Sequence, residues 1–251
     1  PIARYAASEQ IPLLAGHEEL FGVQPTVGFV LHATKADDHP GEGGPSGPMD
    51  AHIHALLKGV SEQGREVAAP AVLLENTKGD FAGGRWLFVN LAPEEALWSA
   101  DGLGALAEWS RFCDKGVTEM WLKPHFATYY PGEQPAFTLQ LQSLARRAGS
   151  AGAPAPSRRW SLALTVERPD NANDDRTLWK TERTEEAGRE LGFVRLNVPL
   201  AVEPGYYEVE CRAVSSDGEV RLLRQGFWGF DEQLLSSGGF LGADRDYFRR
   251  D

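Results

Sequence analysis

The stretch "YYPGEQPAFTLQLQSL", residues 129–144, marks the point where the spacing of apolar residues changes along the chain. Phe137, Leu139 and Leu141 alternate with polar residues, which is the pattern of a β-strand that buries one face. Helix signals precede this stretch, and alternation dominates after it. The change predicts a domain boundary near residue 130, where the two tyrosines at its start pack the two domains together.

Alternation continues through the second half of the chain. It recurs in "RRWSLALTVERP", in "FVRLNVPL" and in "GYYEVECRAVSSDGEVRLL", where "SSDG" is a hairpin signal. We expect about six or seven short strands after residue 135, each with one apolar face. This number is typical of an immunoglobulin-like β-sandwich, here without the cysteine pair of antibody domains. The predicted sandwich spans residues 131–235, and residues 236–251 are a linker toward a following domain.

Two segments of the first 130 residues have the apolar spacing of an amphipathic helix. The first is "DAHIHALLKGVSEQG", residues 50–64, whose apolar positions are Ile53, Leu56, Leu57 and Val60. The second is "SADGLGALAEWSRFCDKG", residues 99–116, with Ser99 as a plausible N-cap and Gly116 as a stop. Its apolar face is formed by Leu103, Leu106, Trp109 and Cys113.

Four apolar segments predict strands around these helices. They are the run from Val27 to Leu31, "REVAAPAVLLEN", "RWLFVNL" and "TEMWLKPHFATYY". The resulting order is strand, helix, strand, strand, helix, strand, which suggests α/β or α+β packing around a mostly buried sheet. The predicted fold class is therefore an α/β (or α+β) domain over residues 1–130, followed by an all-β immunoglobulin-like sandwich.

Composition and charge exclude several classes of partner. The chain has 251 residues and a net charge of −11. This charge argues against nucleic-acid binding, which needs a basic footprint, and against attraction to an anionic membrane surface. No apolar run approaches the ~20 residues needed to span a bilayer. Cys113 and Cys211 lie far apart in the sequence and predict two buried thiols rather than a disulfide.

No cofactor or metal site is predicted. The six histidines do not have metal-ligand spacing, and the glycine-rich segment "GEGGPSGP" lacks the Lys-Ser/Thr of a phosphate loop. His52 and His54 are two residues apart, and on the predicted helix they would project about 200° apart and could not share an ion.

Two carboxylates are candidates for catalysis. Glu75 ends the segment "AVLLEN" and Glu119 begins "EMWLKPHF". Glycoside hydrolases use a pair of carboxylates, of which one donates a proton and the other acts as nucleophile or base. Two carboxylates at strand ends could form such a pair. The alternative for Glu75 is that it braces the "NTKGD" turn. About 130 residues are too few for an eight-stranded barrel, which takes about 250.

Aromatic residues provide the candidates for ligand binding. Aromatic faces stack on the apolar faces of sugar rings, although most tryptophans fill cores. The candidates for an exposed platform are Trp121, His125, Tyr130 and Trp228.

The second half of the chain resembles a known class of protein. "YYPGEQPAFTLQLQSL", "WSLALTVERPD" and "LNVPLAVEPGYYEVECRAVSSDGEV" are similar to the β-sandwich modules of large bacterial extracellular proteins. "GFWGFDEQLLSSGGFLGADRDYFRRD" resembles the linker that leads into the catalytic barrel of β-galactosidase-type glycoside hydrolases. The first half is similar to the α/β accessory domains of such enzymes, without a matching motif.

The resemblance implies that the chain is a non-catalytic accessory region of a longer, carbohydrate-active protein. Its implied partners are a carbohydrate and a catalytic domain of the same protein. No catalytic residue of the hydrolase families matches a position here. Two alternatives remain: a catalytic glycosidase fragment that uses Glu75 and Glu119, and a protein-interaction module with no link to carbohydrate.

Overall fold

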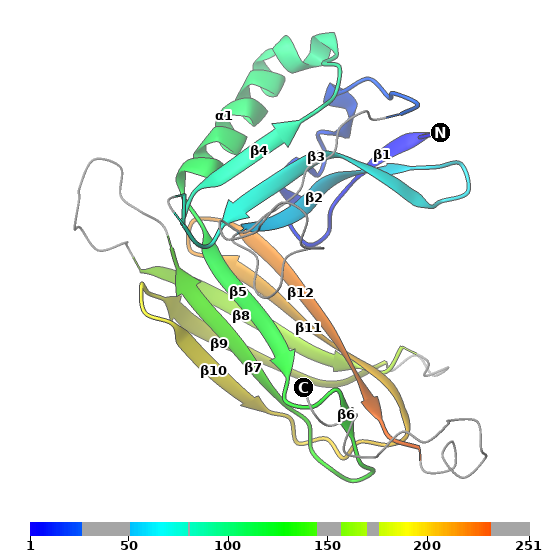
Figure 1. The fold of residues 1–251 in the computed structure, drawn as a ribbon, viewed down its shortest axis with the longest axis vertical. Coiled ribbons are helices and arrows are strands. Elements are labelled where there is room, and N and C mark those ends of the chain that lie inside the picture. The colour runs from blue at the N-terminus through cyan, green and yellow to red at the C-terminus, as the bar shows by residue number, and fades with distance from the viewer. Residues whose placement is uncertain (27–50, 80, 145–156, 170–175, 232–251) are drawn as a thin grey trace, which may run out of the picture. The chain divides into compact units, whose positions relative to one another are not determined.

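The computed structural model of the chain describes residues 1–26, 51–79, 81–144, 157–169 and 176–231 (Figure 1). The strand predicted from Val27 to Leu31, the glycine-rich segment after it and the linker predicted for residues 236–251 lie outside these residues. The chain divides into two compact units. The first contains Pro1–Glu119 and Ser143–Pro156, and the second contains Met120–Gln142 and Ser157–Asp251.

The first unit is built on an antiparallel sheet with the strand order β1-β2-β3-β4. Its strands are β1 (Arg4–Ala7), β2 (Ala51–Val60), β3 (Glu66–Asn76) and β4 (Arg85–Val89). Its helices are the short 3-10 turns η1 (Pro12–Leu14), η2 (Glu18–Leu20) and η3 (Glu95–Trp98), and the α-helix α1 (Ala100–Asp114). Leu57 and Leu73 of the sheet share one buried core with Trp109 and Phe112 of α1. An antiparallel sheet packed with a helix is α+β architecture, the second of the two classes predicted for this part of the chain.

The helix predicted over residues 50–64 is wrong, because this segment is the strand β2. β2 pairs with β3, and the register shifts between Ala55 and Leu57 and again between Leu57 and Gly59. Such bulges interrupt the two-residue alternation, so that Leu56 and Leu57 are both fully buried. A bulged strand thereby reproduces the i, i+3, i+4 spacing of a helix. Gly64, with φ of 76°, belongs to the turn between the strands.

The helix predicted over residues 99–116 is confirmed as α1. Ser99 is its N-cap, and its side chain accepts a hydrogen bond from the Gly102 backbone N–H. The buried residues of the helix are Gly102, Ala105, Trp109 and Phe112. Leu103, predicted to face the core, is instead 50% exposed, so the buried face is rotated by about one residue from the predicted one. Gly102 is required where it lies, because a Cβ there would be 2.3 Å from the Leu97 carbonyl oxygen.

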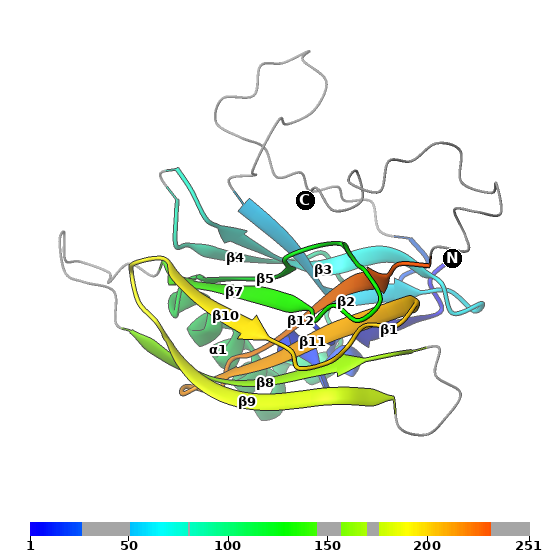
Figure 2. The same cartoon turned by 90° about the horizontal axis from the view of Figure 1, so that it is seen from below.

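The second unit consists of two sheets, one with the order β10-β7-β5 and one with the order β6-β12-β11-β8-β9 (Figure 2). The three-stranded sheet contains β5 (Thr118–Pro124), β7 (Ala136–Ser143) and β10 (Gly192–Asn197). The five-stranded sheet contains β6 (Thr128–Tyr129), β8 (Arg158–Glu167), β9 (Thr177–Ala187), β11 (Gly205–Ser215) and β12 (Val220–Gly229).

One hydrophobic core takes side chains from both sheets of the second unit. The alternating apolar positions predicted from the sequence supply much of it, which confirms the two-residue period. Fully buried members include Phe137, Leu139, Leu141, Trp160, Leu162, Leu164, Tyr207 and Val209. Because the side chains of a strand alternate, the residues between the buried ones face outward on both sheets.

Tyr129 lies in the core of the second unit. Its ring contacts Phe227 at a centroid distance of 5.5 Å, and its hydroxyl donates to the Ala136 carbonyl at 3.0 Å. A turn follows it, with Gly132 at φ of 84°. The tyrosine thus fastens this turn to the strands on either side of it.

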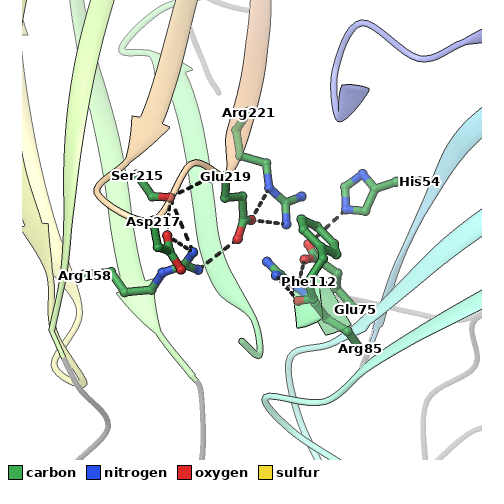
Figure 3. Close-up of polar contacts among 9 residues, drawn as sticks. All are labelled: His54, Glu75, Arg85, Phe112, Arg158, Ser215, Asp217, Glu219 and Arg221. Atoms are coloured by element: carbon green, nitrogen blue, oxygen red, sulfur yellow. Dashed lines mark hydrogen bonds and ion pairs between the residues drawn. The ribbon is translucent and has the colours of Figure 1, made fainter. Parts of the chain in front are cut away.

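A buried charged network closes the hairpin between β11 and β12 (Figure 3). Glu219 Oε2 accepts from Arg158 Nη1 at 2.9 Å, and Glu219 Oε1 accepts from Arg221 Nε at 2.8 Å. Arg158 also donates to Asp217 at 2.6 Å. The backbone N–H of Glu219 donates to Ser215 Oγ at 2.8 Å. The turn predicted from "SSDG" is therefore held by ion pairs as well as by backbone bonds.

Candidate functional site

The histidines of β2 lie on the same face of the sheet. Because β2 is a strand, residues two apart project to the same side, and the ring centroids of His52 and His54 are 6.3 Å apart. The inference that these rings point in different directions rested on the predicted helix and is wrong for the same reason. The two catalytic candidates, Glu75 and Glu119, each lie beside one of these rings.

The Glu75 carboxylate forms a buried ion pair with Arg85 and also contacts His54 (Figure 3). Its Oε1 accepts from Arg85 Nε at 2.8 Å, and its Oε2 is 3.3 Å from His54 Nε2. The side chains of Glu75 and Arg85 are 5% and 0% exposed. Arg85 also donates to the Phe112 carbonyl at 3.0 Å, and its guanidinium lies 4.2 Å from the centre of the Phe112 ring. These contacts join β3 and β4 to α1.

The side chain of Glu119 is less buried than that of Glu75. Its Oε1 is 3.8 Å from His52 Nε2, and its side chain is 18% exposed. A glycosidase carboxylate must reach the scissile bond from an open site. Both oxygens of Glu75 contact protein side chains and the group is almost fully buried, so its environment favours a structural role. Of the two carboxylates, Glu119 is the one with an accessible side chain.

Among the described residues, no group of three or more histidine, cysteine, aspartate or glutamate side chains could hold a metal ion. The two cysteines are free thiols, as the sequence predicts, but only Cys211 is buried and Cys113 is partly exposed. Burial raises the pKa of Cys211 to about 12, and the nearby Glu210 charge adds to this shift. Burial also raises the pKa of Cys113, although the positive charge of Arg85 opposes the shift.

The four ligand-binding candidates lie on two different faces of the second unit. Trp121 and His125 belong to the strand and turn that form one edge of the three-stranded sheet. Trp228 belongs to β12 of the five-stranded sheet, and Tyr130 directly follows β6, which pairs with β12 in parallel. Because the hydrophobic core separates the outer faces of the two sheets, the four residues do not form one site.

Tyr130 and Trp228 are part of a larger aromatic surface. Tyr206 faces Trp228 across β11 and β12, with ring centroids 5.1 Å apart, and Tyr130 contacts Phe230 at 5.6 Å. Trp228 is 55% exposed. These four residues, Tyr130, Tyr206, Trp228 and Phe230, are called the aromatic strip below.

Backbone pairing places the two halves of the strip next to each other. Trp228 pairs with Thr128 in the parallel ladder, and the Phe230 N–H donates to the Tyr129 carbonyl at 2.8 Å. Gly226 leaves room for the ring of Tyr206, because a Cβ at position 226 would lie 2.5 Å from the Tyr206 hydroxyl oxygen.

The strip has charged neighbours on the same strands. Arg224 Nε donates to Glu210 Oε2 at 2.7 Å and lies 3.9 Å from Glu208 Oε1. Glu208 is the cross-strand partner of Gly226. Tyr206 is not among the binding residues predicted from the sequence. Its outward position could have been predicted from its neighbour Tyr207, because adjacent residues of a strand face opposite sides and Tyr207 is predicted to be buried.

His125 has a polar environment on the other sheet. Its Nε2 is 2.9 Å from Thr138 Oγ1. Burial lowers the pKa of His125, and the positive charge of Arg195 lowers it further. Trp121 is 38% exposed, and the Lys123 ammonium lies 5.8 Å from the centre of its ring.

No helix in the described part of the chain is long and apolar enough to cross a membrane. Comparison with known proteins adds no assignment: no protein-family model matches the sequence, and no curated protein matches it.

Proposed function

We propose that this chain is a non-catalytic accessory region of a carbohydrate-active enzyme, and that it holds a neutral polysaccharide near a catalytic domain of the same protein. The observation that carries the proposal is the aromatic strip. Trp228 is half exposed beside Tyr206, on the rigid support of paired strands. Exposed aromatic rings bind the apolar faces of sugars, and the neighbouring Arg224, Glu208 and Glu210 offer hydrogen bonds to hydroxyl groups.

We further propose that the second unit is an immunoglobulin-like sandwich. Its strand order supports this, with β5, β7 and β10 in the places of strands A, B and E, and with β8, β9, β11 and β12 in those of C, C′, F and G. Two side chains support it as well. Trp160 is fully buried on β8, and the Tyr207 hydroxyl at the start of β11 donates to the Glu203 carbonyl at 3.1 Å. Both are hallmarks of this fold.

The proposed function is tested by affinity electrophoresis of the full chain through gels that contain a neutral polysaccharide such as cellulose ether, xylan or galactan. We expect at least one of these gels to retard the chain. Trp228→Ala should abolish the retardation, because it removes the most exposed ring of the strip. Trp98→Ala is the matched control, since Trp98 is 64% exposed in the first unit and should leave retardation unchanged. Equal loss in both variants, or no retardation in any gel, would contradict the proposal.

The catalytic alternative requires turnover. Under the proposed function, the chain does not hydrolyse aryl glycosides across a broad panel of sugars. Hydrolysis that disappears in Glu119→Gln, with the free energy of unfolding unchanged, would instead support a glycosidase. Glu119 is the better residue for this test than Glu75, whose replacement also breaks a buried ion pair.

A further inference from the structure

The outer face of the three-stranded sheet carries two exposed aromatic rings and two cations. Leu122, Leu139 and Leu196 point from its three strands into the core. The neighbouring residues of each strand therefore point outward. The outward residues of the central part of this face are Trp121, Lys123, Thr138, Gln140, Phe193 and Arg195.

The register of β5 against β7 follows from two backbone hydrogen bonds. The His125 N–H donates to the Ala136 carbonyl at 2.8 Å, and the Leu144 N–H donates to the Val117 carbonyl at 2.9 Å. In an antiparallel pair, a step forward along one strand matches a step back along the other. From Val117 to His125 the first strand advances as many residues as the second goes back from Leu144 to Ala136, so both bonds belong to one register. β5 and β7 are hydrogen-bonded neighbours in the sheet, and we extend this register to the residues between the two bonds.

This register places Trp121 directly opposite Gln140 on β7. On the other side of β7, Gln140 is the partner of Phe193. The amide of Gln140 is thus flanked by two aromatic side chains in one row across the sheet. Trp121 is 38% exposed and Phe193 is 64% exposed. Two strand spacings separate them, roughly 10 Å.

The next row of the same face is cationic. By the same register Lys123 lies opposite Thr138, and Thr138 is the partner of Arg195 on β10. Lys123 is directed toward the ring of Trp121, and the charge of Arg195 contributes to the lowered pKa of His125. In the described part of the chain neither cation has an ion pair with a carboxylate. An electropositive row on a chain of net charge −11 favours an anionic ligand.

We propose that this face, called the basic-aromatic face, binds an acidic polysaccharide whose sugar units carry carboxylates. The apolar faces of the sugar rings stack on Trp121 and Phe193, and Gln140 and Thr138 bond to hydroxyl groups. Lys123 and Arg195 bind the carboxylates, Arg195 through paired hydrogen bonds. The proposal rests on the proposed function in that the ligand is a carbohydrate, but it uses a different surface from the aromatic strip.

A single-stranded nucleic acid has related chemistry, since it offers both stacking faces and negative charge. The basic-aromatic face fits a sugar polymer better. Grooves that bind nucleic acid follow its backbone with many cations, whereas this face has two cations and the chain is acidic overall.

The probe for the experiment is polygalacturonate, and the protein is the full chain. We expect polygalacturonate to retard it in affinity gels, and the binding to weaken with rising salt because it depends on charge. Arg195→Gln should weaken binding by about tenfold, as expected for the loss of one charge-assisted contact. Trp121→Ala should weaken it by a similar factor. Lys180→Gln is the matched control, since it removes an exposed cation from β9 on the opposite sheet and should leave binding unchanged.

Several results would overturn the proposal. They are no retardation by polygalacturonate, equal binding of a neutral glucan with no effect of Arg195→Gln, and tighter binding of an oligothymidylate than of polygalacturonate. Arg195→Lys keeps the charge and should retain part of the affinity, which separates loss of binding from loss of folding. Trp228→Ala distinguishes the two proposals. If it abolishes binding of neutral polysaccharide but not of polygalacturonate, the two surfaces act independently.

Discussion

Each unit buries a glutamate that pairs with arginine, but the surroundings of the two glutamates differ in how fully they are enclosed. In the second unit Glu219 is 0% exposed and is shared by Arg158 and Arg221. In the first unit Glu75 pairs with Arg85, and it also contacts His54, whose side chain is 27% exposed. Buried pairs of this kind add little net stability over apolar residues, yet loss of one partner is costly because it leaves a charge without compensation. The comparison suggests that Glu219 is the less replaceable of the two.

The largest effect is expected from Glu219→Gln. It leaves two buried arginines facing a neutral amide, although Arg158 keeps its contact with Asp217, and we expect the free energy of unfolding of the second unit to fall by about 3–5 kcal/mol. The buried thiol of Cys211 is the reporter, because its pKa of about 12 keeps it protonated and unreactive at pH 8 in the folded unit. Alkylation of Cys211 should therefore accelerate strongly in the variant.

Glu186→Gln is the control for this measurement. Glu186 pairs with Arg159 at 3.5 Å with both side chains more than half exposed, and such a pair contributes about 0–1 kcal/mol. If Glu186→Gln accelerated the labelling of Cys211 as much as Glu219→Gln does, burial of the carboxylate would not explain the loss of stability in Glu219→Gln.

A smaller effect is expected from Glu75→Gln. The amide oxygen can still accept from Arg85, and His54 has access to water, so we expect a loss of about 2–3 kcal/mol. Cys113 of α1 reports on this unit, because burial raises the pKa of its thiol. Faster labelling of Cys113 with unchanged labelling of Cys211 is the expected result. If Glu75→Gln lowered the free energy of unfolding as much as Glu219→Gln, the two buried glutamates would not differ in their importance for stability.

The smallest effect is expected when both members of the first pair become apolar. Glu75→Leu combined with Arg85→Met removes the buried charges together, and the free energy of unfolding should lie within about 1 kcal/mol of the original chain. Urea unfolding followed through tryptophan fluorescence measures it. A double variant that is less stable than Glu75→Gln would mean that the ion pair holds α1 through its geometry rather than through charge compensation.

The sequence predicts the second unit better than the first for a physical reason. The strands that contain Leu139, Leu162 and Val209 each bury one face, and strict alternation makes this visible locally. β9 carries no such signal, because it lies at the edge of its sheet with polar residues exposed on both sides. In β2 the bulges replace alternation with helical spacing, and the partner strand that reveals the bulges is not a local property.

The candidate site was predictable only in part. The residue types were recognisable, and the side of a strand on which Trp121 lies follows from its buried neighbour Leu122. Which strands lie side by side is decided by long-range pairing, so the separation of Trp121 from Trp228 could not be read from spacing. The contact of Glu75 with Arg85 depends on the register of β3 and β4, so this buried ion pair could not be predicted from the spacing of residues along the chain.

The turn at Gly132 follows Tyr129 and Tyr130. Two strands that precede this turn in the sequence pair with strands that follow it. β5 precedes it and pairs with β7, and β6 precedes it and pairs with β12. A protease that nicks the chain at this turn therefore leaves fragments bound to each other through two strand ladders and the ring of Tyr129. The same arrangement makes residue 132 a place to divide the protein into halves that reassemble by complementation, whereas neither half alone would hold a complete second unit.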